Sequence, residues 1–345
     1  MISSKVSIKR LGIVTCLLQL DEQDTFFMFV NEAISRDNLE VFVFDADDLS
    51  KDNFVTAKRI NKPVTYKTRE NLGEEKVMVK IDDFDLIFLK KDPPIDVSYE
   101  YLLKTLIKKK IPTVNRAGGV LEMGTKSYLE NFSELTPKTF YSNTVRRTLK
   151  CIKNIGNSMI KKSDSSGGKG VKHIRYNSGN FYRYIRGKEV LLAEKDLSLI
   201  IKKYLEDSLD KTILVVEYLL SAPKRGDKRV VILEGDILGS YIRLPDAISG
   251  VCVCSDNGVK ICDPTEADRE IVRILKPHLT NNGIGLAALD LLIGKDGVEY
   301  LSEINVFNPG FCNLDIVHPE LNIKKKVVDM LFRKLCKGYQ TRVAS

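Results

Sequence analysis

The chain has 345 residues, more than one compact core usually holds, and this length predicts two or three domains. Hydrophobic residues make up 43% and charged residues 29% of the chain, which excludes general disorder. The net charge of +8 favours an anionic partner. Lysines and arginines are nevertheless scattered rather than interleaved with aromatic residues, so we expect no nucleic-acid partner.

No segment predicts export or membrane insertion. The longest apolar stretch, residues 11–20, is interrupted by Thr15 and Gln19, whereas a membrane span needs about 20 apolar residues. It also lacks a signal-peptide cleavage site. The seven cysteines are an odd number without a secretory signal, which indicates reduced thiols, and the three histidines show no zinc-site spacing. We therefore expect a cytoplasmic protein with no membrane partner.

The first third of the chain alternates predicted strands and helices. Strands are expected at residues 11–18, 41–44, 86–89 and 113–115, and helices at 25–35, capped by Asp24, and at 101–107. This alternation predicts a parallel α/β sheet. Ligands of such sheets bind beyond the carboxyl ends of the strands, and this rule places Lys90, Lys91, Asp92 and Asn115 at a crevice.

The rest of the chain predicts a mixture of helices and antiparallel strands. Helices are expected at residues 126–132, 193–205, 264–279 and 323–336, and strands at 159–162, 171–174 and 212–219. Two hairpins are expected, at 230–242 and 286–306, each around a tight turn.

A glycine-rich segment joins the strands at 159–162 and 171–174. Its sequence is Asp164-Ser165-Ser166-Gly167-Gly168-Lys169-Gly170, and its glycines let backbone N–H groups approach a phosphate. It is not a Walker A loop, because the first glycine and the Ser/Thr after the lysine are absent. A plain hairpin turn is the alternative interpretation.

Polar side chains interrupt the apolar strands of the second hairpin. Asp290 lies on one strand, and Glu303 and Asn305 lie two residues apart on its partner, so the last two face the same side. Burying such groups is costly without compensation. Oxygen ligands on adjacent strands suit Mg²⁺ that bridges nucleotide phosphates. The alternative is a hydrogen-bonded polar cluster without metal.

Several isolated charges fit the same chemistry. Arg229 and Arg243 flank the first hairpin and could clamp a phosphate or carboxylate, although surface ion pairs are an alternative. Lys161 interrupts a buried strand and, with Lys126, could reach nucleotide phosphates. Glu217 ends an apolar strand, as a hinge that reads an adenine edge requires.

The order of these features resembles the ATP-grasp superfamily and, within it, the bacterial-type glutathione synthetase family. The resemblance covers nearly the whole chain. It includes the motifs Lys90-Lys91-Asp92-Pro93-Pro94, Val114-Asn115, Leu135-Thr136-Pro137, Gly226-Asp227-Lys228-Arg229-Val230 and Glu303-Ile304-Asn305-Val306.

The resemblance implies an α/β fold with an N-terminal domain and a two-lobed ATP-grasp unit. The parallel-sheet, substrate-binding domain would span residues 1–124, the small lobe (lid) 125–210, and the large lobe with the metal site 211–345. The implied enzyme is an ATP-dependent carboxylate–amine ligase. It would join γ-glutamylcysteine and glycine through an acyl phosphate, releasing ADP and phosphate without a catalytic thiol.

The resemblance also implies a role for each candidate residue. Arg229 and Arg243 would be catalytic, stabilising the transferred phosphoryl group and the substrate carboxylate. The other implied groups are ATP-binding Lys126, Lys161, Gly167, Gly168, Glu217, Tyr218, Leu219 and Asp227, substrate-binding Lys90, Lys91, Asp92, Asn115, Asn308 and Gly310, and metal-binding Asp290, Glu303 and Asn305. The cofactors would be ATP and Mg²⁺, with Mn²⁺ as a substitute. The partners would be a small acidic peptide, an amino acid and further copies of the chain.

Residues 244–257 depart from the family pattern. They lack its Arg-Gly-Asn segment and paired glycines, and Asp164-Ser165-Ser166 replaces a more glycine-rich start of the phosphate loop. This departure leaves open another ATP-grasp ligase with different peptide or amino-acid substrates. A non-catalytic ATP-binding regulator is a further alternative, but Asp290, Glu303 and Asn305 argue against it, since a dead site is expected to lose metal ligands.

Overall fold

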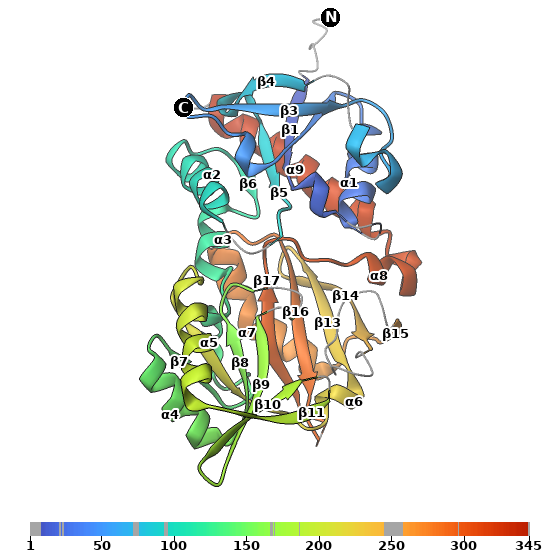
Figure 1. Cartoon of the computed structure of the whole chain (residues 1–345). Coiled ribbons are helices and arrows are strands. Elements are labelled where there is room, and N and C mark those ends of the chain that lie inside the picture. The colour runs from blue at the N-terminus through green and yellow to red at the C-terminus, as the bar shows by residue number, and fades with distance from the viewer. Residues whose placement is uncertain are drawn as a thin grey trace, which may run out of the picture.

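The structure is a computed structural model that describes residues 8–20, 22, 24–71, 76–92, 96–165, 168, 170–185, 187–244, 258–295 and 297–343. Figure 1 shows the N-terminal domain above a lower body that contains the other two sheets. In the part of the chain that is described, no helix has the length and apolarity needed to cross a membrane.

The N-terminal domain contains a mixed sheet. Its strands are β1 (Lys9–Val14), β2 (Leu39–Phe44), β3 (Phe54–Ile60), β4 (Lys76–Lys80), β5 (Leu86–Leu89) and β6 (Thr113–Val114). Their order is β4-β3-β2-β1-β5-β6. The predicted parallel pairing is confirmed for β2, β1, β5 and β6, but β3 and β4 pair antiparallel at one edge. We missed β3 and β4 because their many charged residues give only a weak apolar pattern.

Helices cover both faces of this sheet. They are α1 (Thr25–Ile34), α2 (Val97–Lys108), α3 (Ala117–Met123) and α9 (Ile323–Val343). The Asp24 side chain accepts a hydrogen bond from the backbone N–H of Phe26, which confirms the predicted N-cap of α1. Helices α1 and α9 share one core with the sheet, whereas α2 and α3 pack on the other face. An ion pair of 2.8 Å between Arg36, just after α1, and Asp329 of α9 also links the two helices.

The position of α9 differs from the predicted domain division. Residues 211–345 were assigned to the large lobe, yet α9 returns to the N-terminal domain and crosses it in Figure 1. Its apolar residues Val327, Val328 and Leu331 are buried beside Phe26 and Phe29 of α1. The last helix therefore completes the core of the first domain.

The small lobe is an antiparallel sheet covered on one face by two helices. Its elements are β7 (Thr139–Ser142), β8 (Asn157–Lys162), β9 (Val171–Asn177), β10 (Asn180–Ile185), β11 (Lys188–Leu192), β12 (Ile213–Glu217), α4 (Val145–Ile155) and α5 (Glu194–Glu206). The strand order is β11-β10-β9-β8-β12-β7. Strand β12 pairs with β8 and β7, so it belongs to this lobe although the predicted boundary precedes it. Residues 126–132, predicted as a helix, form a 3₁₀ helix.

The large lobe is a second antiparallel sheet, formed largely by the two predicted hairpins. Its elements are β13 (Asp227–Leu233), β14 (Asp236–Arg243), β15 (Val259–Ile261), β16 (Leu286–Ile293), β17 (Glu299–Asn305), α6 (Ala222–Arg225), α7 (Glu266–Asn281) and α8 (Cys312–Val317). The strand order is β15-β14-β13-β16-β17. A shared core joins Leu214 and Val216 of the small lobe to Leu289, Leu291 and Leu301 of this sheet, so the two lobes pack face to face.

Asn115 connects the N-terminal domain to the large lobe. Its Nδ2 donates to the carbonyl oxygens of Leu286 and Val306, both at 2.7 Å. Its Oδ1 accepts from the backbone N–H groups of Gly285 and Leu286, both at 2.9 Å. These four bonds use the whole hydrogen-bonding capacity of the amide. The side-chain amide of Asn115 therefore has no free donor or acceptor for the predicted contact with substrate.

We expect Asn115→Ala to lower the free energy of unfolding by about 3 kcal/mol, because buried backbone groups would lose their partners. Urea denaturation of the full chain measures this loss. Asn180→Ala, at the exposed start of β10, is the matched control and should change stability by less than about 0.5 kcal/mol. Equal stability of the two variants would contradict the role of Asn115 at the junction.

Candidate active site

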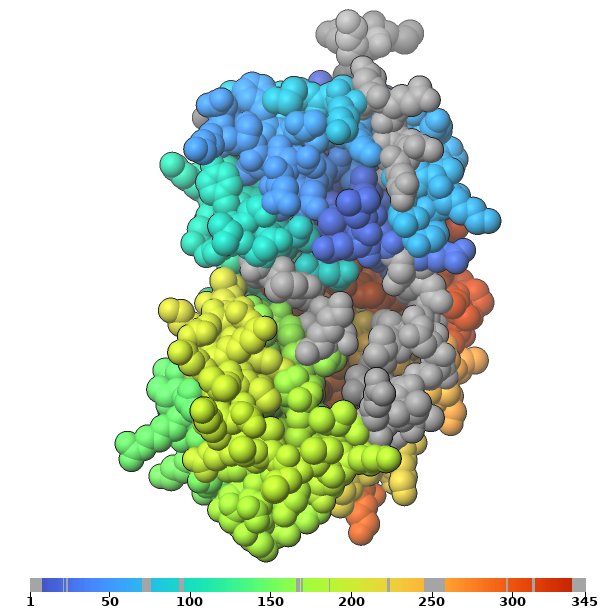
Figure 2. Space-filling model, in the orientation of Figure 1, coloured from blue at the N-terminus to red at the C-terminus, as the bar shows by residue number. Residues whose placement is uncertain are grey.

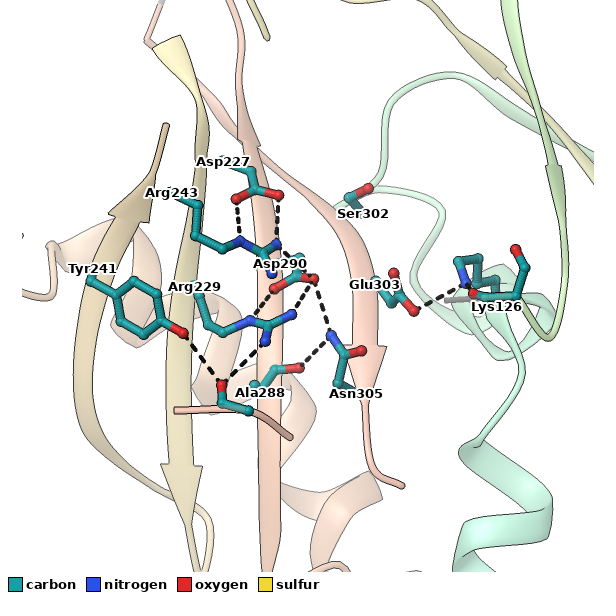
Figure 3. A network of polar contacts seen from close by, with 12 residues as sticks. Lys126, Asp227, Arg229, Tyr241, Arg243, Ala288, Asp290, Ser302, Glu303 and Asn305 are labelled. Atoms are coloured by element: carbon teal, nitrogen blue, oxygen red, sulfur yellow. Dashed lines mark hydrogen bonds and ion pairs between the residues drawn. The ribbon is translucent and has the colours of Figure 1, made fainter. Parts of the chain in front are cut away.

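Two arginines and two aspartates form a buried network in the large-lobe sheet. Arg229 pairs with Asp290 through two hydrogen bonds, Nε to Oδ1 at 2.7 Å and Nη2 to Oδ2 at 2.8 Å. Arg243 pairs with Asp227 in the same way, at 2.6 and 2.5 Å, and its Nη2 also lies 3.0 Å from Asp290 Oδ2. Figure 3 shows these side chains converging from β13, β14 and β16. The structure thus brings together both predicted catalytic arginines and one predicted metal ligand.

The cross-strand register explains this arrangement. Arg229 lies opposite Asp290, and Asp227 lies opposite Arg243, so each acid faces a guanidinium on a neighbouring strand. Burial alone would raise the pKa of the Asp290 carboxyl, but Arg229 and Arg243 outweigh it and hold that pKa below its usual range. Asp290 therefore stays ionised inside the sheet.

Asp227 has a different position from the one predicted. We expected it to contact ATP, but both of its carboxylate oxygens accept hydrogen bonds from Arg243. This pairing fixes the plane of the Arg243 guanidinium. The geometry therefore makes Asp227 an orienting partner of Arg243.

The turn that contains Asn308 and Gly310 meets the network and the N-terminal domain. The carbonyl oxygen of Gly310 accepts from Arg229 Nη1 at 3.1 Å and from the Tyr241 hydroxyl at 3.3 Å. Asn308 accepts a hydrogen bond from Lys90 Nζ and donates to Asp92 Oδ1 at 3.1 Å. Four predicted substrate-binding residues, Lys90, Asp92, Asn308 and Gly310, are therefore connected here.

Lys91 is directed elsewhere. Its Nζ lies 2.6 Å from Asp45 Oδ1 and 3.6 Å from Asp96 Oδ2, within the N-terminal domain. Burial lowers the pKa of Lys91, but the hydrogen bond and charge of Asp45 outweigh burial and raise that pKa. The structure therefore separates Lys91 from the turn that its neighbour Lys90 contacts.

Two lysines of the small lobe contact β17. Lys126 Nζ lies 3.0 Å from Glu303 Oε1 and also donates to the carbonyl oxygen of Ser165. Lys161 Nζ donates to the Ser302 hydroxyl at 2.9 Å. Figure 3 shows Glu303 pointing away from the arginines and toward Lys126. Both predicted phosphate-binding lysines therefore meet the strand that carries two predicted metal ligands.

At the hinge between the lobes, two backbone groups that we expected near adenosine already form hydrogen bonds within the protein. The backbone N–H of Glu217 donates to Lys138 O at 2.9 Å, and that of Tyr218 donates to Asn157 O at 3.0 Å. The N–H of Tyr218 is thus already used within the protein, and Leu219 follows it outside any helix or strand. Gly168 has a positive φ of 71°, which suits glycine, and Gly167 lies outside the described residues.

The predicted metal ligands offer a limited set of oxygen atoms. No group of three or more His, Cys, Asp or Glu side chains suited to a metal ion occurs among the described residues. Asn305 donates from Nδ2 to Asp290 Oδ2 at 3.1 Å, and its amide oxygen points toward the side of Glu303 in Figure 3. Two carboxylates and one amide fit Mg²⁺, which usually completes its coordination with phosphate oxygens and water.

Sequence reasoning missed three supporting residues. Ser302 contacts Lys161, and Tyr241 contacts Gly310. Lys228 is almost fully buried, with Nζ 2.5 Å from Asp268 and 2.9 Å from Glu299. The alternation of side chains along β13 could have identified the position of Lys228. This lysine lies between two network residues and must therefore face the opposite side of the sheet.

The comparisons with known proteins agree with this geometry. The family model described as prokaryotic glutathione synthetase, ATP-grasp domain, matches residues 125–318, more than half of the chain. The model described as prokaryotic glutathione synthetase, N-terminal domain, matches residues 17–120. The chain belongs to the prokaryotic glutathione synthetase family.

Curated relatives and solved structures extend this result. A glutathione synthetase of Gloeobacter violaceus is 28% identical over 262 residues, 73% of each chain. A glutathione synthetase of Yersinia pestis is 26% identical over 323 residues, 91% of this chain and 93% of the relative. The crystal structure of a D-cycloserine synthetase shares the fold, with a TM-score of 0.64 and 15% identity over 93% of this chain and 99% of that one. The predicted family and ATP-grasp fold are confirmed, and the chain is an ATP-dependent, ADP-forming carbon–nitrogen ligase.

The environment of Lys161 predicts a pH dependence. Burial lowers its pKa to about 8, although the charge of Glu303 opposes this shift. A lysine is charged below its pKa and neutral above it, so we expect the affinity for ATP to fall as the pH rises through 8. The KM for ATP between pH 7 and 9 measures this effect.

Lys161→Arg provides the control, because a guanidinium keeps its charge throughout this range. The variant should lose the steep rise in KM above pH 8, even if its KM at pH 7 is higher. An identical pH profile for the variant and the parent protein would exclude Lys161 as its source.

Proposed function

We propose that this ligase joins the cysteine carboxyl group of γ-glutamylcysteine to the amino group of glycine. ATP would activate the carboxylate as an acyl phosphate, with release of ADP and then phosphate. The proposal is supported by the family, by the names of the curated relatives, and above all by the contacts of one strand. Strand β17 meets the small-lobe lysines through Ser302 and Glu303 and the arginine network through Asn305.

This convergence suits phosphoryl transfer, which depends mainly on positioning and charge neutralisation. Lys126 and Lys161 would offset the charge of the triphosphate from the small lobe. Arg229 would hold the peptide carboxylate beside the turn at Gly310, because its guanidinium already contacts that turn. The buried acids fix both arginines in advance, so little reorganisation is needed when negative charge develops.

The covalent steps require no protein nucleophile. The peptide carboxylate attacks the γ-phosphorus, a new C–O–P link forms and ADP leaves. The glycine amine then attacks the acyl carbon, an amide bond forms and phosphate leaves. The side chains of Lys90, Asp92 and Asn308, already linked to each other, would border the site of this second attack.

Asp290, Glu303 and Asn305 would hold Mg²⁺, for which Mn²⁺ is a possible substitute. When bound, the ion would offset negative charge on the phosphates of ATP. Glu303 pairs with Lys126 at 3.0 Å, so the same carboxylate also orients a lysine for the phosphates. A cytoplasmic location stays a prediction from the sequence, and a homo-oligomer stays one from the family resemblance.

The substrates need a direct test because residues 244–257 depart from the family pattern. Most of this segment, 245–257, lies outside the described residues. We expect purified protein with Mg·ATP to release ADP only when γ-glutamylcysteine and glycine are both present. A panel of other dipeptides and amino acids serves as the comparison. ADP release with a different acid–amine pair alone would overturn the substrate assignment but keep the ligase.

Glu303→Gln tests the metal and lysine contacts together. The variant loses a carboxylate ligand of Mg²⁺, so the phosphate charge of ATP would be poorly neutralised. We therefore expect kcat to fall by at least about 100-fold. Glu206→Gln on α5, whose side chain is 64% exposed, is the matched control and should retain full activity. Near-normal turnover by Glu303→Gln would refute the assignment of Glu303.

A further inference from the structure

Three aromatic rings form a continuous stack in the small lobe. The imidazole of His173 lies between two tyrosine rings, with centroid distances of 4.1 Å to Tyr184 and 3.9 Å to Tyr218. The interplanar angles are 9° and 21°, so all three rings are nearly parallel. The stack joins β9, β10 and the hinge segment that follows β12.

The stack lies on the face of the small-lobe sheet that meets the large lobe. His173 pairs across the strands with Met159, and Lys161 follows Met159 by two residues on the same face of β8. Met159 packs with the core shared by the two lobes, as does Val216, which pairs with it on β12. The rings therefore belong to the same surface as the lysine expected to contact the phosphates.

Asn157 fixes both ends of the contact between His173 and Tyr218. Its side-chain Oδ1 lies 2.6 Å from His173 Nε2, and its carbonyl oxygen accepts the backbone N–H of Tyr218 at 3.0 Å. An amide oxygen only accepts, so His173 Nε2 carries the proton and donates it. Asn157, at the start of β8, thus holds both the histidine ring and the backbone of the hinge in position.

The histidine in this stack is neutral at ordinary pH. Burial lowers the pKa of His173 to about 4, since the charged form would lose its hydration. A neutral imidazole stacks on tyrosine without carrying a positive charge toward the nearby lysines. The contact is therefore unchanged across the pH range in which ATP ligases are assayed.

We propose that His173 is a positioning residue for the nucleotide base. It holds the Tyr218 ring, and with it the hinge segment 217–219, against the lid sheet, so that the base of ATP meets a preformed wall. This inference rests on the proposed ATP site and assigns the base end of that site to the stack. The phosphate end depends on Lys126 and Lys161, which the stack does not include.

The two ends of the nucleotide can therefore be tested separately. His173→Ala opens the stack, and we expect it to weaken ADP binding about tenfold, in line with the value of an aromatic contact. Inorganic tripolyphosphate has no base, so its affinity for His173→Ala should stay within about twofold of its affinity for the parent protein. At saturating ATP, kcat should change little while KM rises, because the reacting groups are untouched.

Matched variants separate positioning from general loss of structure. His173→Phe keeps a ring between the tyrosines and should restore most of the ADP affinity, whereas Tyr184→Leu should weaken it as His173→Ala does. Tyr101→Leu, at an exposed site on α2, is the control for tyrosine replacement and should have no effect.

Titration calorimetry with ADP and with tripolyphosphate gives the deciding result. Unchanged ADP affinity in His173→Ala, or an equal loss for ADP and tripolyphosphate, would overturn the role of His173. Both measurements are independent of turnover. A failure of the peptide-ligase assay would therefore refute the proposed substrates without deciding this inference.

Discussion

The carboxylate of Asp290 brings a negative charge into the middle of an antiparallel sheet, where burial penalises it unless cations surround it. Arg229 and Arg243 supply those cations, and Asp227 balances the second of them. Two positive and two negative side chains thus form a neutral group. Removing one member would leave an uncompensated buried charge, which is more costly than losing an exposed ion pair.

The other parts of the site are arranged around this network. Its members lie on β13, β14 and β16, and Asn305 connects it to β17. Arg229 and Tyr241 extend it to the turn at Gly310, and Asn308 connects that turn to Lys90 and Asp92. The acceptor side of the proposed reaction is therefore built from two domains, because contacts between them fix the turn.

The domains depend on each other for similar reasons. Asn115 of the first domain satisfies backbone groups of β16 and of the chain after β17. In return, α9 at the end of the chain fills the core of the first domain. Figure 2 shows the N-terminal domain and the small lobe as adjacent masses on one face. Asn115 and α9 therefore both hold the N-terminal domain in place relative to the rest of the chain.

Local pattern predicted much of this protein. Continuous apolar runs located β5 and β16, the Asp24 cap located α1, and the ordered motifs led to the family. Strand β4 at the sheet edge and its neighbour β3 escaped prediction because both carry charged residues, which weaken the apolar pattern. The boundary before β12 was also wrong, since a single strand does not reveal which sheet it joins.

The sequence by itself determined the family, the types of the candidate residues and their order along the chain. Only the tertiary structure decided their partners: Asp227 with Arg243, Asn115 with the large lobe, and Lys91 with Asp45 rather than with the turn at Asn308. The same is true of the ring stack, whose three members lie on three separate segments. Periodicity reports which face a side chain occupies, but cross-strand register and domain packing decide what it meets there.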